Sequence, residues 1–92
     1  MRWSVGIEVE SRRVLTREQV VDLADAVAPS DGIATGIGTN RYGARLVVEA
    51  DSREEAIKKA TVEFWRAVRK ARLQRGPVVM TEAVSEDEDA AG

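Results

Sequence analysis

The sequence contains neither cysteine nor histidine, and only four of its 92 residues are aromatic. Without cysteine the chain has no disulfide framework, no thiolate nucleophile and no cysteine-ligated zinc or iron–sulfur centre. Without histidine it also lacks the commonest general base at neutral pH and the commonest metal ligand. No apolar run reaches the length of about 18 residues that a membrane-spanning helix needs, and the N-terminus lacks the layout of a signal peptide. We therefore expect a cytoplasmic protein with no membrane contact, no metal and no other cofactor.

Charge is unevenly distributed along the chain, although the net charge is only −2. Residues 1–55 carry seven basic and ten acidic side chains, and residues 76–92 carry five acidic side chains and no basic one. The segment between them, residues 56–75, carries seven basic side chains against one acidic side chain. The chain thus has a basic segment followed by an acidic one, in a length that suits one domain with a core of modest size.

Apolar periodicity predicts a strand and a helix in the first third of the chain. Residues 2–10 alternate between apolar and polar side chains, which is typical of a strand with one buried face. Thr16 and Gln19 are spaced as a capping box, and the helical apolar stripe behind them stops before Pro29. A helix is therefore expected between Thr16 and Pro29.

The remainder of the chain predicts a hairpin and a second helix. Residues 33–49 alternate on both sides of a glycine-containing turn at residues 38–41. Ser52 and Glu55 are spaced as a second capping box. The helix that follows is expected to continue to about Arg72, because a Gly-Pro pair soon after it is a firm stop signal.

A last strand over residues 78–83 completes a single domain of residues 1–84, and the acidic residues 85–92 are expected to form a disordered tail. The order β-α-β-β-α-β folds into a four-stranded antiparallel sheet with both helices on one face. This order resembles the ferredoxin-like superfold. The segment ARLVVEADSREEA, residues 44–56, is similar to the strand-to-helix joint of short uncharacterised actinobacterial proteins of that fold. The resemblance implies an α+β fold and no particular activity.

The second predicted helix, residues 52–73, has two different faces. Its apolar arc must face the sheet. The opposite arc carries basic, indole and aliphatic side chains, namely Lys58, Lys59, Val62, Trp65, Arg66, Arg69, Lys70 and Arg72. Because Trp and Arg are favoured at binding hot spots, we expect this face to contact a protein partner, with Val62, Trp65, Arg66 and Arg69 as anchors. In the alternative, Trp65 covers the seam between the two helices and the cations only solubilise the surface.

The first helix carries the opposite charge on its outer arc, at Glu18, Asp22 and Asp25. The simplest expectation is that the two helices pair across their seam, with little gain in stability. Alternatively, two copies dock about a two-fold axis with the acidic half of each on the basic half of the other. Edge-to-edge pairing through the glycine-rich residues 33–38 is a second route to a dimer, so a homodimer is expected.

Nucleic-acid binding is the main alternative function, because the same cations also suit phosphate. In this hypothesis the acidic tail, residues 85–92, folds back on the basic helix and must be displaced before nucleic acid binds. Flexible tethering would give the tail an effective concentration on the order of millimolar. The tail can equally be a solubilising end, or a short motif for a basic partner.

Catalysis is not expected, and no catalytic residue is assigned. Glu8 and Glu49 lie on the two central strands, but an exposed face lacks the desolvation that acid–base catalysis needs. That face also lacks the aromatic residues that stack bases in RNA-binding domains of this superfold, and Arg45 opposite Glu8 or Glu49 suits a wet dimer interface. The glycine-rich residues 32–43 lead into a strand and not a helix, which favours a hairpin over a phosphate loop. An enzyme using Arg41 and Arg45 on an acidic substrate would need a pocket beside this hairpin.

Overall fold

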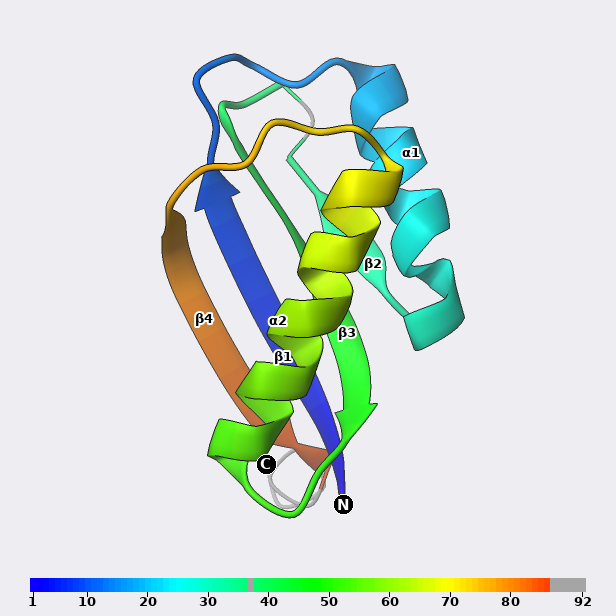
Figure 1. Ribbon diagram of the computed structural model, residues 1–92, viewed down its shortest axis with the longest axis vertical. Helices are drawn as coiled ribbons and strands as arrows, with labels where there is room; N and C mark the ends of the chain where they lie inside the picture. Colours follow the sequence, from blue (N-terminus) through cyan, green and yellow to red (C-terminus); the bar gives the residue numbers. More distant parts are fainter. Residues whose placement is uncertain (37, 87–92) are drawn as a thin grey trace.

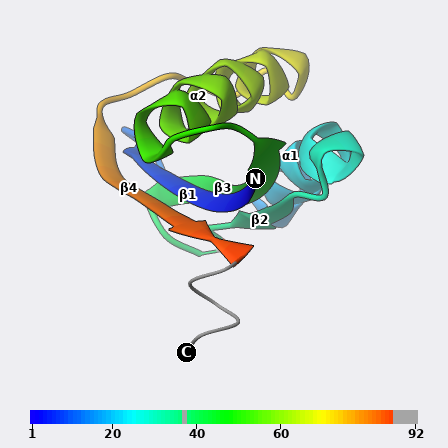
Figure 2. The same ribbon diagram turned by 90° about the horizontal axis from the view of Figure 1, so that it is seen from below.

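The computed structural model describes residues 1–36 and 38–86. In chain order its elements are β1 (Arg2–Glu10), α1 (Arg17–Val27), a 3-10 turn η1 (Ala28–Ser30), β2 (Ile33–Thr35), β3 (Arg41–Glu49), α2 (Arg53–Lys70) and β4 (Val78–Ser85). The four strands form one antiparallel sheet in the order β2-β3-β1-β4. Both helices cover the same face of this sheet and leave the other face open (Figures 1 and 2). The predicted ferredoxin-like α+β fold is confirmed.

The core lies between the helix-covered face of the sheet and the apolar arc of α2. The alternate residues of β1 that the sequence assigns to the buried face, Trp3, Val5, Ile7 and Val9, are all buried. Phe64 of α2 packs over them with its ring 6.2 Å from the Tyr42 ring of β3. The Trp3 indole N–H also donates a hydrogen bond to the Ala50 carbonyl at 3.1 Å, so its polar atom is satisfied in the core.

Side-chain caps begin both helices, but they differ in completeness. At α1 the predicted capping box forms in full, since the Gln19 N–H donates to Thr16 Oγ1 at 3.2 Å and the Thr16 N–H donates to Gln19 Oε1 at 2.9 Å. At α2 the Glu55 N–H donates to Ser52 Oγ at 3.2 Å. The Glu55 carboxylate, however, accepts from the Asp51 N–H at 3.4 Å and not from the N-cap residue. Only half of the second predicted capping box is therefore present.

Helix α2 ends at Lys70, and the prediction that it continues to about Arg72 is wrong. The Leu73 N–H donates to the Val68 carbonyl at 3.0 Å and the Arg72 N–H donates to the Arg69 carbonyl at 3.1 Å. These two bonds define a Schellman motif, with Arg72 at the left-handed position that glycine usually occupies. The helix stops early because this turn carries Leu73 into the core.

The strands also differ from the prediction at their ends. β2 is three residues long, and Ile37, which the alternation assigns to the same strand, lies outside the described residues. β3 begins at Arg41, which the sequence assigns to the turn. β4 continues to Ser85 because it pairs with β1 as far as Trp3. Of the predicted disordered tail, residues 87–92 lie outside the described residues.

The chain topology places three connectors at one end of the molecule (Figure 1). β1 and α2 both end there, and β3 begins there, so residues 11–16, 38–40 and 71–77 are neighbours. Backbone hydrogen bonds hold these connectors together: Ser11 N–H to the Asn40 carbonyl at 2.7 Å, and Glu10 N–H to the Pro77 carbonyl at 3.0 Å. This end of the molecule is therefore an ordered surface built from segments that are far apart in the sequence.

Candidate functional site

Two cations of α2, Lys59 and Arg66, form ion pairs within the protein. Lys59 Nζ donates to the Glu49 carbonyl at 2.8 Å and forms an ion pair with Glu55 at 3.2 Å. The hydrogen bond from Lys59 is the main cause that holds the pKa of Glu55 below its ordinary value, with a smaller contribution from the Asp51 N–H. Arg66 pairs with Glu63 of the preceding turn at 2.9 Å. Lys59 and Arg66 are therefore engaged within the protein, and their role in partner binding stays a prediction.

Most of the cations without an ion-pair partner in the described part of the chain lie at the C-terminal end of α2 and on the connectors beside it. Within residues 1–36 and 38–86, nine Arg and Lys side chains have no carboxylate oxygen within 4.0 Å and no other ion-pair partner. One of these is Lys58, in the second turn of α2. The other eight belong to the connectors and to the helix and strand ends beside them, and we call them the basic end: Arg12, Arg13, Arg17, Arg41, Arg69, Lys70, Arg72 and Arg75. Even with Glu10 and Glu18 nearby, this end has a clear excess of positive charge.

Four residues spaced by four, three and four positions form a straight line along the outside of α2. We call them the outer stripe: Lys58, Val62, Trp65 and Arg69. Val62 is 58% exposed although it is aliphatic, and Trp65 is half-buried. The stripe runs into the basic end at Arg69, so the apolar and the basic surfaces are continuous. This continuity supports the predicted roles of Val62, Trp65 and Arg69 in one contact surface.

Trp65 is held from two sides. Its ring meets the Phe64 ring edge-on, with centroids 5.2 Å apart, and the Arg75 guanidinium lies 4.3 Å from the Trp65 ring centroid. Arg75 comes from the connector between α2 and β4, and both residues line one small hollow with Arg69 and Arg72. Trp65 therefore packs against this connector, and the alternative that it covers the seam between the two helices is not what the structure has.

The seam between the helices carries the expected opposite charges without the expected pairing. Asp22 and Asp25 of α1 line a hollow together with Lys70 and Arg72. None of these four side chains, however, has an ion-pair partner within 4.0 Å in the described part of the chain. The cations at the end of α2 thus remain available to an outside partner.

A second group of arginines surrounds a hollow of about 490 Å³ between two connectors. Arg12 and Arg13 lie on the connector that follows β1, and Arg72 lies just past α2. The sequence places Arg72 on the outer face of the helix, but the Schellman turn moves it off the helix and beside Arg12 and Arg13. The topology itself is the signal that could have grouped them, because the β1–α1 and α2–β4 connectors of this fold emerge at the same end.

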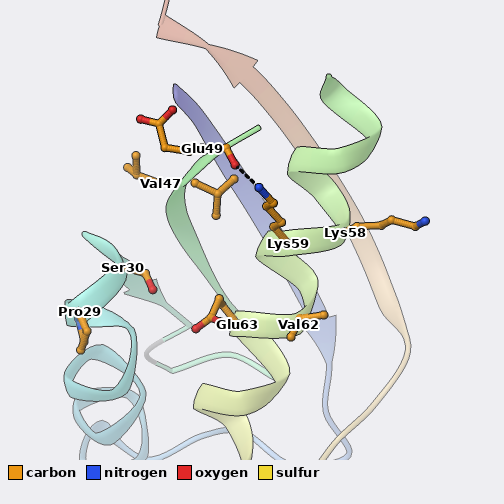
Figure 3. Close-up of a pocket in the computed structure, with 9 residues that line it drawn as sticks. Pro29, Ser30, Val47, Glu49, Lys58, Lys59, Val62 and Glu63 are labelled. Carbon is orange, nitrogen blue, oxygen red and sulfur yellow. Dashed lines mark hydrogen bonds between the residues drawn. The ribbon is translucent and has the colours of Figure 1, made fainter. Parts of the chain in front are cut away.

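A groove lies between α2, β3 and the turn η1 (Figure 3). Lys59 reaches across it to the Glu49 carbonyl, while Lys58 points away from it. Glu63, on the same groove, is occupied by Arg66. Lys59 and Glu63 are thus engaged within the protein, whereas Lys58 and Val62, which also line the groove, belong to the outer stripe.

The open face of the sheet is also internally paired. Arg45 of β3 donates to Ser4 Oγ at 3.0 Å and reaches Glu82 of β4 at 3.3 Å. Its guanidinium crosses the intervening strand over Gly6, where a side chain would crowd it. Within the protein Arg45 is thus engaged by Ser4 and Glu82, and its contact with Glu8 or Glu49 across a dimer interface stays a prediction.

The structure also bears on the carboxylate pair, the metal site and the membrane helix considered from the sequence. Glu8 lies opposite Gly43 and Glu49 lies opposite Arg2, so the two carboxylates are six positions apart along the sheet, about 20 Å, and form no pair. Within residues 1–36 and 38–86 no group of three or more His, Cys, Asp or Glu residues gathers that could hold a metal ion. Among the described helices, none has the length and apolar character needed to cross a membrane.

No protein-family model, curated protein or solved structure matches this chain. The basic end and the outer stripe are therefore the basis for a functional proposal.

Proposed function

We propose that the protein is a non-catalytic binding module that contacts an acidic protein partner through the outer stripe and the basic end. The observation that carries this proposal is that, among the described residues, eight cations without an ion-pair partner gather at one end of a protein whose net charge is −2, and that three of them, Arg69, Arg72 and Arg75, line a hollow with the half-buried Trp65. Lys59 and Arg66 of α2 are paired within the protein, so the unpaired cations mark a surface that internal ion pairs do not use.

The physical chemistry of the surface favours a protein partner. Tryptophan and arginine are enriched at interface hot spots, and the Trp65 ring is already fixed between Phe64 and Arg75. A fixed ring loses little conformational freedom when a partner covers it. The adjacent Val62, 58% exposed, adds apolar area that solubility does not require. Arginines around this apolar centre can form charge-assisted hydrogen bonds with carboxylates of the partner.

A second copy of the chain is one candidate for the acidic partner, because α1 presents Glu18, Asp22 and Asp25 on its exposed side. The nucleic-acid alternative has less support. The acidic tail leaves β4 at the end of the molecule opposite the basic end (Figure 1), where Glu86 pairs with Arg2 at 3.3 Å. The tail therefore starts near other cations than those it is expected to screen.

Affinity capture from the native extract tests the proposal. The tagged wild-type chain and the Val62→Asp variant are compared, with Val21→Asp on α1 as the matched control because Val21 is 49% exposed. Exposed Val→Asp changes in a helix have small effects on stability, since the helix propensities of the two residues are similar. Each capture is run with and without nuclease.

We expect one acidic protein to be retained by wild type and Val21→Asp after nuclease, and lost with Val62→Asp. If the chain itself is the acidic partner, both variants should lose it, because Val21 lies on α1 between Glu18 and Asp25. Equal retention by both variants would show that the outer stripe is not the contact surface. Recovery that nuclease abolishes would replace the proposal with nucleic-acid binding.

A further inference from the structure

We infer that the hollow between residues 11–16 and 72–74 is a binding site for a dianionic phosphoryl group, carried by a small phosphate monoester or by free phosphate. Arg12, Arg13 and Arg72 line this hollow and also belong to the basic end, but Val62 and Trp65 do not line it, so phosphate binding and partner binding can be tested separately. Its volume of about 490 Å³ lies within the usual range for small-ligand sites, roughly 300–1,000 Å³.

The charge of the lining is one-sided. Three arginines line the hollow, and none of the ten lining residues is acidic. Arg12, Arg13 and Arg72 also have no ion-pair partner among the described residues. The planar fork of arginine matches the oxygens of phosphate in a bidentate fashion, which makes arginine the preferred residue for phosphate recognition. Three such forks around one hollow match a group of charge near −2 better than the single charge of a phosphodiester.

The backbone at Arg72 points to the same conclusion. Arg72 has φ +59°, in the left-handed region, at a helix-ending position where glycine is the usual residue. A β-carbon in this conformation costs about 1–2 kcal/mol. The fold alone would favour glycine here, and strained positions of this kind concentrate at functional sites. Binding of an anion by the side chain of Arg72 explains why a strained arginine occupies the position.

The walls of the hollow are fixed before any ligand binds. Leu15 and Leu73 are buried in the core beneath it. The Leu15 N–H donates to the Thr39 carbonyl at 3.2 Å, and the Tyr42 hydroxyl donates to the Gln74 carbonyl at 2.6 Å. Burial raises the pKa of the Tyr42 hydroxyl, and the opposing effect of Arg75 is smaller, so this donor stays protonated at neutral pH. A rigid site loses little entropy on binding.

A neutral donor completes the set of groups that a phosphate ester can use. Gln19 uses its side-chain oxygen to accept the Thr16 N–H, which leaves its amide nitrogen as a donor on the edge of the hollow. Val14, 58% exposed, supplies an apolar surface beside it. A phosphate monoester with a small polar body fits this combination.

The test measures binding of ribose 5-phosphate and, separately, inorganic phosphate to the full chain at low ionic strength by titration calorimetry. Amide resonances of residues 11–16 and 72–74 are followed in parallel by NMR. The variants are Arg72→Gly and Arg12→Gln, and the matched control is Arg41→Gln, which removes a cation of the basic end that does not line the hollow. Thermal unfolding of every variant is recorded.

We expect saturable binding that weakens about tenfold in Arg72→Gly and Arg12→Gln, and less than about twofold in Arg41→Gln. The loss in Arg72→Gly should occur although that variant unfolds at a higher temperature, which separates lost binding from lost folding. Affinity should also fall below about pH 6, where the monoester takes up a proton. Tighter binding of ribose 5-phosphate than of inorganic phosphate assigns the site to an ester, and equal binding assigns it to free phosphate.

Three results would overturn the inference. The first is the absence of saturable binding of either probe at low salt. The second is an equal loss of affinity in Arg41→Gln and Arg72→Gly, which would indicate general electrostatic attraction with no defined site. The third is tighter binding of an oligonucleotide that lacks a terminal phosphate, which would assign the cations to a phosphodiester backbone. The first two results leave the proposed function untouched, because that function is read out by Val62→Asp, whereas the third would also favour nucleic-acid binding over the proposed function.

Discussion

Arg72 is the position at which the structure makes its most specific prediction about stability. Its φ of +59° places a β-carbon in the left-handed region, at the end of α2. Replacement by glycine removes a cost of about 1–2 kcal/mol. Glycine returns about 0.5–1 kcal/mol of this gain, because its unfolded chain has more conformational freedom to lose. The Arg72→Gly variant should therefore be more stable than wild type by about 1 kcal/mol.

A gain of this size is measurable. For a domain of this length it corresponds to a rise of about 4–8 °C in the midpoint of thermal unfolding. Urea unfolding followed by the fluorescence of the two tryptophans gives an independent value of the free energy of unfolding. The midpoint should shift without a change in the slope, because the surface exposed on unfolding stays nearly the same.

Arg72→Ala is the matched control for charge. It removes the same cation but keeps the β-carbon, so the backbone strain remains. We expect Arg72→Ala to be no more stable than wild type, and Arg72→Gly to exceed it by about 1 kcal/mol. Equal stability of the glycine and alanine variants would refute the argument from strain. A gain of the same size in both would show that repulsion among the arginines, and not the backbone, limits stability.

Three further predictions concern the core and pH. Gly43→Ala should lower the free energy of unfolding by about 3 kcal/mol or more, because a β-carbon there would collide with the Ile7 carbonyl oxygen of the paired strand. Urea unfolding measures this loss, and a loss below about 1 kcal/mol would contradict this packing. Tyr42→Phe should lower the free energy of unfolding by about 1–1.5 kcal/mol, because it removes the hydroxyl that donates to the Gln74 carbonyl. An unchanged urea midpoint would show that this hydrogen bond contributes nothing to stability. Burial raises the pKa of Tyr42 above 10.0, so the unfolded chain loses the hydroxyl proton at a lower pH than the folded protein does. The free energy of unfolding of wild type should therefore fall above pH 10. In Tyr42→Phe the contribution of this proton to the fall should be absent.

The local structure could be predicted well because its signals are local. Alternation over residues 2–10 defines a strand with one buried face, and the spacing of Thr16 and Gln19 defines a helix start. These patterns depend on neighbours along the chain, so they survive in the folded protein. The order of the elements then restricts the topology to very few arrangements, since crossovers are right-handed.

The end of α2 could not be predicted in the same way. A Schellman turn is usually announced by glycine, and here Arg72 occupies that position, so the first visible stop signal was Gly76. The burial of Leu73 decides where the helix ends, and burial depends on the whole fold. For the same reason the sequence assigned Arg72 to the helix face and missed its place beside Arg12.

The candidate site depends still more on long-range packing. The sequence correctly marks Val62, Trp65 and Arg69 as residues on the outer side of α2, because helical periodicity alone places them there. It does not identify Arg75 as the cation over the Trp65 ring. It also does not predict that Lys59 donates to the Glu49 carbonyl and pairs with Glu55. Those contacts join residues whose approach is set by tertiary structure.

Site-specific photo-crosslinking can show whether the outer stripe of α2 contacts a protein partner. A photoreactive amino acid is placed at position 62 on the outer stripe of α2 and, as the control, at position 21 on α1; both side chains are exposed. After irradiation in the native extract, we predict a crosslink to one acidic protein from position 62 and none from position 21. Crosslinking of equal yield from both positions, or crosslinking from position 62 only to nucleic acid, would contradict the account.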